Sequence, residues 1–195
     1  MSVGAVTRFA LPAELAWVLR PELGALTAEI AEALEAEGTG AEPAALRMGV
    51  AEALRQFVDD VELGHDARPR RLFFNFGRTE MRAGRPLDGL LAAYRLGGRL
   101  AWRRFAVAGS RAHVAPDTLH RLAEAVFSWV DELSDQSSAG YAQERDAAAS
   151  AAQLRTERLV RLLVAEPAPD PAVVEAAAGQ VPWPLPASVA VAALS

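Results

Sequence analysis

Apolar residues recur at intervals of three and four along most of the chain, which is the spacing of one face of an α-helix. Proline and glycine interrupt this pattern where helices are expected to begin and end. The pattern predicts five main helices, over residues 12–37, 42–63, 69–83, 86–108 and 116–165. Pro21 is expected to bend or split the first helix near its start, because proline lacks the amide hydrogen that a helix interior requires.

Two glycines, Gly97 and Gly98, lie in the middle of the fourth predicted helix. Glycine costs about 1 kcal/mol per residue relative to alanine in a helix interior. A pair of glycines there usually marks either the close approach of another helix or a kink.

The fifth predicted helix changes character along its length. Its first part carries an apolar stripe, whereas residues 134–158 are mainly Ala, Ser, Gln, Glu, Asp and Arg. A segment this polar does not fit the core of a monomer, so we expect it to lie between subunits or to act as a linker. We therefore predict a homodimer formed through residues 116–165, and Gly140 leaves the continuity of this helix open.

The C-terminal part of the sequence predicts a different organisation. Three prolines from Pro167 to Pro171 indicate a hinge, followed by a short helix over residues 171–179. Residues 189–194 have the composition of a strand, and a lone strand has no sheet to join. They form either a terminal tail or, in the favoured interpretation, the start of a further α/β domain. The predicted organisation is a helical domain over 1–166, a linker over 167–186 and a first strand within 187–195.

The composition narrows the class of protein. The chain is 51% apolar and contains no cysteine, and all of its 20 basic residues are arginine. The lack of cysteine removes disulfides, thiolate metal sites and cysteine nucleophiles, and it suits a reducing compartment. No signal peptide and no membrane-length apolar run is visible, which predicts a soluble, cytoplasmic protein without membrane contact. Together with the helical pattern, this predicts an all-α helical bundle. The net charge of −5 argues against nucleic-acid binding by the whole chain.

Positive charge is concentrated in the third and fourth predicted helices. Ten arginines and only two acidic residues lie between residues 68 and 104, a net charge of +8. In the favoured interpretation these arginines pair with acidic helices of the same fold or of a partner subunit. In the alternative, the helices over 69–104 recognise an anionic ligand or an acidic partner. Nucleic acid is a third, weaker alternative, because the whole chain is acidic.

Catalytic and cofactor motifs are not visible in the sequence. The three histidines, His65, His113 and His120, lack a second ligand at metal-binding spacing on a continuous helix, so exposed or capping roles are favoured. None has the pattern of a proximal haem ligand. The nucleophile elbow, the Walker loop and the dinucleotide fingerprint are also missing. We expect no enzyme activity, no metal and no cofactor.

The string FGRTEMRAGRPLDGLLAAYRLGGRLAWRRF, from Phe76 to Phe105, resembles the N-terminal helical domain of PucR-type transcriptional regulators. That domain is related to the N-terminal domain of RsbRD-type proteins, the RsbT co-antagonists. The stretch from Val130 to Tyr141 fits as well, and so does the sequence WPLP at residues 183–186. The resemblance covers most of residues 12–195.

This resemblance implies a regulatory input module of a transcription factor. A GGDEF-like α/β domain would begin near Pro186, and a C-terminal helix-turn-helix outside these 195 residues would be the one part that contacts DNA. Related stress-protein input domains have a globin-like fold without haem, so a globin-like bundle is implied. The family carries no catalytic residues into this region.

The leading hypothesis is therefore a sensory and dimerisation domain in which a ligand or partner changes the packing of the third and fourth helices. The candidate ligand-binding residues are Asn75, Arg78, Tyr94, Arg95 and Trp102. The alternative is a scaffold module of a stress-signalling complex that binds no small molecule. A cavity of a few hundred Å³ lined by Tyr94, Arg95 or Trp102 would favour sensing, whereas a filled core would favour assembly.

Overall fold

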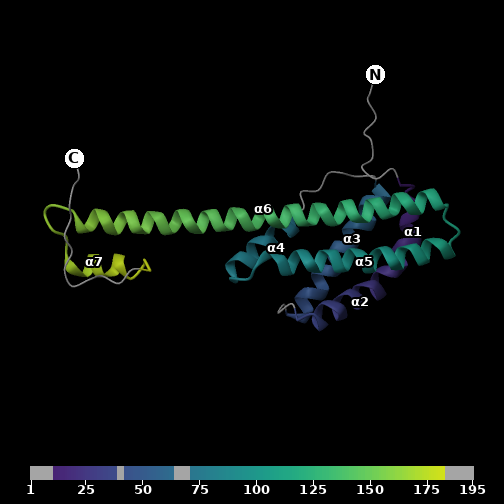
Figure 1. The fold of residues 1–195 in the computed structure, drawn as a ribbon, viewed down its shortest axis with the longest axis horizontal. Helices are drawn as coiled ribbons and strands as arrows, with labels where there is room; N and C mark the ends of the chain where they lie inside the picture. The colour runs from purple at the N-terminus through teal and green to yellow at the C-terminus, as the bar shows by residue number, and fades with distance from the viewer. Residues whose placement is uncertain (1–10, 39–41, 64–70, 183–195) are drawn as a thin grey trace, which may run out of the picture. The chain divides into compact units, whose positions relative to one another are not determined.

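A computed structural model describes residues 11–38, 42–63 and 71–182 of the chain. The described part is helical and contains no strand, which confirms the predicted all-α class. The elements in chain order are α1 (Leu15–Leu19), the 3₁₀ turn η1 (Arg20–Glu22), α2 (Leu23–Ala36), α3 (Pro43–Leu63), α4 (Arg71–Arg82), α5 (Leu87–Arg111), α6 (Pro116–Leu163) and α7 (Pro171–Ala178) (Figure 1). The strand predicted over residues 189–194 lies outside the described residues.

Proline and glycine set the helix boundaries much as their chemistry requires. Pro21 lies in η1 and splits the first predicted helix into α1 and α2. Pro43, Pro116 and Pro171 are each the first residue of a helix, a position where a missing amide hydrogen costs nothing. Gly84 follows α4 with a φ of +67°, a backbone conformation that glycine adopts without strain.

The fourth predicted helix extends three residues further than its apolar pattern indicated, because α5 ends at Arg111. Its end is a Schellman motif, in which the N–H of Val114 bonds to the carbonyl of Gly109 and the N–H of His113 bonds to that of Ser110. His113 occupies the left-handed position of this motif with a φ of 57°. The exposed His113 thus has a local role in ending the helix, as the capping interpretation expected.

The long helix α6 is continuous from Pro116 to Leu163 and passes through Gly140 without a break. Gly140 instead lies where α6 crosses α4. A Cβ atom added there would come within 1.9 Å of the carbonyl oxygen of Phe74. Glycine is needed at this position because two backbones touch, and the helix is not interrupted.

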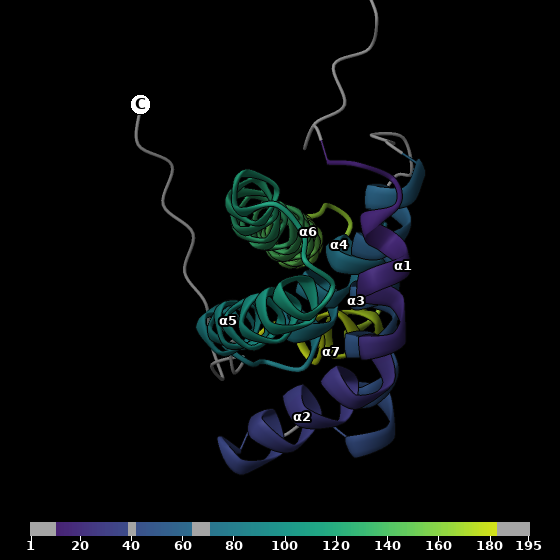
Figure 2. The same ribbon diagram turned by 90° about the vertical axis from the view of Figure 1, so that its right-hand side faces the viewer.

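The chain divides into two compact units, Met1–Tyr141 and Ala142–Ser195, which are described separately. In the first unit, α3 packs against α1 and α2, and α5 packs against α1, α2 and α4. The first part of α6 runs antiparallel beside α5 (Figures 1 and 2). Gly98 lets the two helices approach, since a Cβ atom there would lie 2.5 Å from Val130 Cγ2. Gly98 therefore marks a close helix contact, one of the two alternatives predicted for the glycine pair.

The core of the first unit is built around aromatic rings. Phe57 stacks on Phe105 with a centroid distance of 5.9 Å and contacts Trp129 at 5.2 Å. The apolar residues of the predicted helices mostly face this core, but the large aromatic residues Trp17 and Phe127 do not. Trp17 is 72% exposed and Phe127 is 48% exposed. The neighbouring buried positions, such as Leu19 and Val126, already fill the faces that α1 and α6 turn inward.

The second unit contains the end of α6 and the short helix α7. Leu159 is almost fully buried against Ala177 and Ala178, with four partly buried residues around them. Residues 143–158 of α6 are mostly exposed, in agreement with their polar composition. The domain boundaries predicted at residues 166 and 186 stay predictions. Among the described residues, no helix is both long and apolar enough to cross a membrane.

Candidate ligand-binding cavity

A cavity of about 340 Å³ lies within the first unit, between α2, α3, α4 and α5, with two residues of α6 at its inner wall. This volume is at the lower end of the range of ~300–1,000 Å³ that is typical of small-molecule sites. Aliphatic side chains and small residues form most of the wall: Ile30, Leu34, Leu46, Gly49, Val50, Ala53, Leu54, Leu90, Ala93, Gly97, Gly98 and Leu133. The exposed residues Glu42 and Thr79 are also part of the lining, so they mark its mouth.

Four aromatic side chains complete the wall of the cavity. They are Phe73 and Phe76 on α4, Tyr94 on α5 and Trp129 on α6. Phe73 makes edge-to-face contacts with Phe76 at a centroid distance of 5.9 Å and with Tyr94 at 6.2 Å. The indole N–H of Trp129 is buried and has no hydrogen-bond partner among the described residues. A buried donor without a partner costs about 1–3 kcal/mol, so this wall has unused hydrogen-bonding capacity.

A buried hydrogen-bond chain connects the cavity to α6. The hydroxyl of Ser137, which is fully buried, donates to the backbone carbonyl of Phe73 at 2.9 Å. The hydroxyl oxygens of Tyr94 and Ser137 lie 2.8 Å apart. Because the single hydroxyl hydrogen of Ser137 is used on Phe73, the Tyr94 hydroxyl is the donor in this second bond. Burial raises the pKa of Tyr94, so its phenol stays protonated and keeps the chain intact.

The backbones of α4 and α6 touch at this same place. A Cβ atom added to Gly77 would lie 1.8 Å from the carbonyl oxygen of Ser137, and one added to Gly140 would lie 1.9 Å from that of Phe74. Two glycines, one on each helix, therefore make the crossing possible. The crossing places Ser137 within reach of both Phe73 and Tyr94.

The charged residues in the cavity lining are engaged with local partners. Arg85 forms a bidentate pair with Glu80, with distances of 2.8 Å from Nε to Oε2 and 2.7 Å from Nη2 to Oε1. This pair raises the pKa of Arg85. The Gly84 turn positions it, because the N–H of Arg85 also bonds to the carbonyl of Glu80. The carboxylate of Glu42 accepts the amide hydrogens of Ala45 and Ala44, which lowers the pKa of Glu42.

Of the five residues that the sequence suggested as a ligand site, only Tyr94 lines this cavity. Asn75 and Arg95 are exposed on α4 and α5, and Arg78 and Trp102 are half-buried outside the lining. The remaining lining residues are mostly Ala, Gly, Leu and Val. These residue types are equally common in a filled core, so the sequence contained no signal that separated a cavity wall from ordinary packing.

The arginines of α5 differ in whether they form ion pairs. Arg104 bridges Glu22 and Glu29 at 2.8 and 2.7 Å, so it joins α5 to η1 and α2 as the favoured interpretation expected. Three others form an exposed stripe on α5 and have no ion-pair partner among the described residues: Arg95, Arg99 and Arg103. We refer to these three residues as the α5 arginine stripe.

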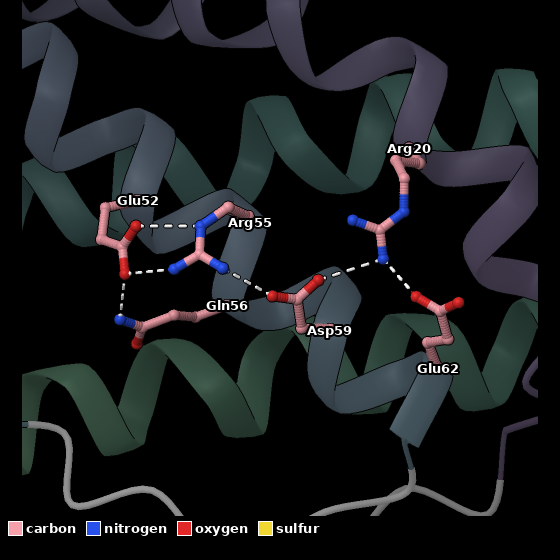
Figure 3. Close-up of polar contacts among 6 residues, drawn as sticks. All are labelled: Arg20, Glu52, Arg55, Gln56, Asp59 and Glu62. Carbon is pink, nitrogen blue, oxygen red and sulfur yellow. Dashed lines mark hydrogen bonds and ion pairs between the residues drawn. The ribbon is translucent and has the colours of Figure 1, made fainter.

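A cluster of charged residues lies on α3 and η1, and its members form ion pairs with one another (Figure 3). Arg55 bonds to Glu52 and to Asp59, and Arg20 bonds to Asp59 and to Glu62. Each carboxylate in the figure has an arginine partner, so the cluster ties η1 to α3. No group of three potential metal ligands occurs in the part of the chain that the structure describes, and His65 lies outside that part.

The fold and the cavity define a class of protein: an all-α domain that encloses a ligand-sized apolar space connected to a long helix. A comparison with protein-family models matches the PucR-like N-terminal domain over residues 9–164. The chain therefore belongs to the family of PucR-like N-terminal domains. Searches of curated proteins and of solved structures find no match to it.

Proposed function

We propose that this chain is the regulatory input domain of a PucR-family transcriptional regulator and that it responds to a small molecule bound in the cavity. The family membership supports a regulatory role. The proposal of a sensory role rests on the cavity. Tyr94 lines it, and the hydroxyl of Tyr94 bonds directly to Ser137 of α6. The domain acts in the cytoplasm by binding rather than by catalysis.

The proposed mechanism is a change in packing between α4, α5 and α6. A ligand that contacts Tyr94 perturbs the bond between Tyr94 and Ser137, and Ser137 in turn donates to the backbone carbonyl of Phe73. Backbone atoms of α4 and α6 already touch at their crossing, so the two helices cannot move closer together there. A ligand can therefore shift the balance between two arrangements of α6 if it binds them with different affinities. The helix-turn-helix that contacts DNA lies outside these 195 residues in this proposal.

We also propose that the domain forms a homodimer through α6. Phe127 is 48% exposed on this helix, close in sequence to the exposed acidic residues Glu124 and Asp131. The α5 arginine stripe offers the opposite charge for a second copy. Sedimentation at tens of micromolar should detect a dimer, and the change Phe127→Asp should weaken it. A monomer at that concentration would contradict this part of the proposal.

The regulatory role is tested in the regulator that contains this chain. Its intact form and a form lacking residues 1–165 are compared for DNA binding and for expression of a target gene, with and without the inducing condition. The intact form should respond to the condition, and the shortened form should lose that response. Identical behaviour of the two forms would refute the proposal.

A scaffold module without a small-molecule ligand is the second candidate function. The observation that favours it is the α5 arginine stripe, for which the described residues offer no ion-pair partner. The two candidates differ in what the freshly purified chain retains. Native mass spectrometry should show an added small-molecule mass if the cavity is a sensor site. A dimer without added mass, together with loss of an acidic partner after Arg99→Glu, would favour the scaffold.

A further inference from the structure

We propose that the cavity accepts a neutral, mainly aromatic small molecule with one hydrogen-bonding group, and not an anion. This inference rests on the proposed function, in which the cavity is a ligand site. It replaces the anionic ligand that the arginine content suggested, because the α5 arginine stripe does not line the cavity.

The shape and chemistry of the wall favour an aromatic ring system. Phe73, Phe76, Tyr94 and Trp129 come from three different helices and meet around the cavity. Aromatic pairs gain about 0.5–1.5 kcal/mol beyond simple area burial when their rings pack edge-to-face or offset. A flat aromatic ligand can make such contacts with Phe76 and Tyr94, which are partly exposed, whereas Phe73 and Trp129 are almost fully buried. A sugar or a short peptide leaves polar groups against an apolar wall.

The charged lining residues argue against an anion. Glu42, Glu80 and Arg85 together carry a net charge of −1, and each already has a partner. Glu80 already neutralises the Arg85 guanidinium, so a ligand carboxylate that bonded to the remaining Nη1 edge would add a second negative charge beside that of Glu80. The electrostatic field at the mouth of the cavity therefore disfavours a negatively charged ligand.

The unused hydrogen-bonding capacity lies on neutral groups. Tyr94 donates to Ser137, so its hydroxyl oxygen can still accept a hydrogen bond. The indole N–H of Trp129 also lacks a partner among the described residues, but it is buried within the wall and has almost no surface that a ligand could reach. A neutral ligand with an amine or a hydroxyl group can donate a hydrogen bond to the Tyr94 oxygen without burying a charge.

Two fluorescent probes with the same ring system separate the alternatives. N-phenyl-1-naphthylamine is neutral, and 1-anilinonaphthalene-8-sulfonate adds a sulfonate to the same skeleton. Each is titrated into the 195-residue chain, and the rise in emission gives the dissociation constant and the stoichiometry. The neutral probe should bind one site per chain, with an affinity at least about tenfold higher than that of the sulfonate, because the buried sulfonate lacks a free cation.

Variants locate the probe in the cavity. Ala53→Leu on α3 should fill part of the space and weaken the neutral probe by about 10- to 100-fold. Ala51→Leu is the matched control, since Ala51 is exposed on the same helix, and it should leave binding unchanged. Circular dichroism reports whether each variant is folded. If Ala53→Leu unfolds, Ala93→Leu replaces it, because Ala93 lines the same cavity from α5.

Several results would overturn the inference. One is tighter binding of the sulfonate probe, lost on Arg85→Gln, which would identify an anion site. Equal weakening by Ala53→Leu and Ala51→Leu, or no binding of either probe, would also overturn it. An apparent affinity that falls as protein concentration rises would show that a second copy fills the cavity. None of these results bears on the response of the regulator to deletion of residues 1–165, so the two proposals fail separately.

Discussion

At the scale of single residues, glycine has two different roles that the sequence does not distinguish. Gly84 ends a helix with a positive φ, directly after the predicted helix over residues 69–83, where a terminating glycine is expected. Gly77 and Gly140 lie inside helices and allow two backbones to touch. Which helix crosses at a glycine depends on residues some 60 positions away in the chain. Only the tertiary structure could therefore identify this second role.

The crossing makes a direct prediction about Gly77 and Gly140. Gly77→Ala and Gly140→Ala should each lower the free energy of unfolding by about 3 kcal/mol or more, because the new methyl group overlaps a backbone oxygen that cannot rotate away. Gly89→Ala on α5 is the control, since nothing lies within 4 Å of its added Cβ. That change should be neutral or stabilise by up to about 1 kcal/mol. Urea denaturation followed by circular dichroism measures all three, and equal effects would contradict the crossing.

The buried phenol of Tyr94 predicts a pH dependence of stability. In an unfolded chain tyrosine has a pKa of about 10, and burial raises the pKa of Tyr94 in the folded state. Below pH ~10 both states keep the proton, so stability is unaffected there. Above that pH only the unfolded state releases the proton, which stabilises it and lowers the free energy of unfolding.

The effect is measured with Tyr141→Phe as the background, so that Tyr94 is the one remaining tyrosine. Between pH 9 and pH 11 this protein should lose about 1 kcal/mol more than the double variant that also carries Tyr94→Phe. At pH 7 the added Tyr94→Phe change should cost about 0.5–1.5 kcal/mol, the value of one hydrogen bond. Parallel profiles for the two proteins would mean that the Tyr94 phenol is not held in the folded state as described.

At the scale of elements, the apolar period and the prolines were sufficient to locate every described main helix. The split at Pro21 and the start of α3 at Pro43 follow from the geometry of proline alone. The end of α5 was less predictable, because His113 is an unusual residue for the left-handed position of a Schellman motif. The continuity of α6 through Gly140 required knowledge of its neighbour α4.

The ion pairs of Arg104 allow a test of how much charge stabilises the packing of α5 against η1 and α2. Its guanidinium connects α5 with Glu22 of η1 and Glu29 of α2, whereas Arg103 next to it has no ion-pair partner among the described residues. Arg104→Gln should lower the free energy of unfolding by about 0.5–1 kcal/mol, since the groups are partly exposed. Arg103→Gln should have no effect. The difference should shrink in 1 M salt, and a salt-independent loss would point to packing rather than charge.

At the scale of the whole molecule, the two compact units should respond separately to mutations. Leu159→Ala removes the main buried side chain of the second unit, a type of change that costs about 2–5 kcal/mol. Hydrogen exchange over α7 should become faster, while exchange in α3 and α5 should stay the same. Leu154→Ala on the same helix is the control, because Leu154 is 63% exposed. Faster exchange throughout the chain would show that the units do not unfold independently.

The sequence by itself determined the all-α class, the helix positions, the arginine-rich segment and the family resemblance. These properties are local, since they depend on spacing, on proline and glycine chemistry and on short strings of residues. The tertiary structure decided which apolar residues enclose a cavity and which fill a core, and it brought Tyr94, Ser137 and Phe73 together across three helices. Leu, Ala and Gly have the same side chains in either place. The difference arises only from how the helices pack, which no local pattern encodes.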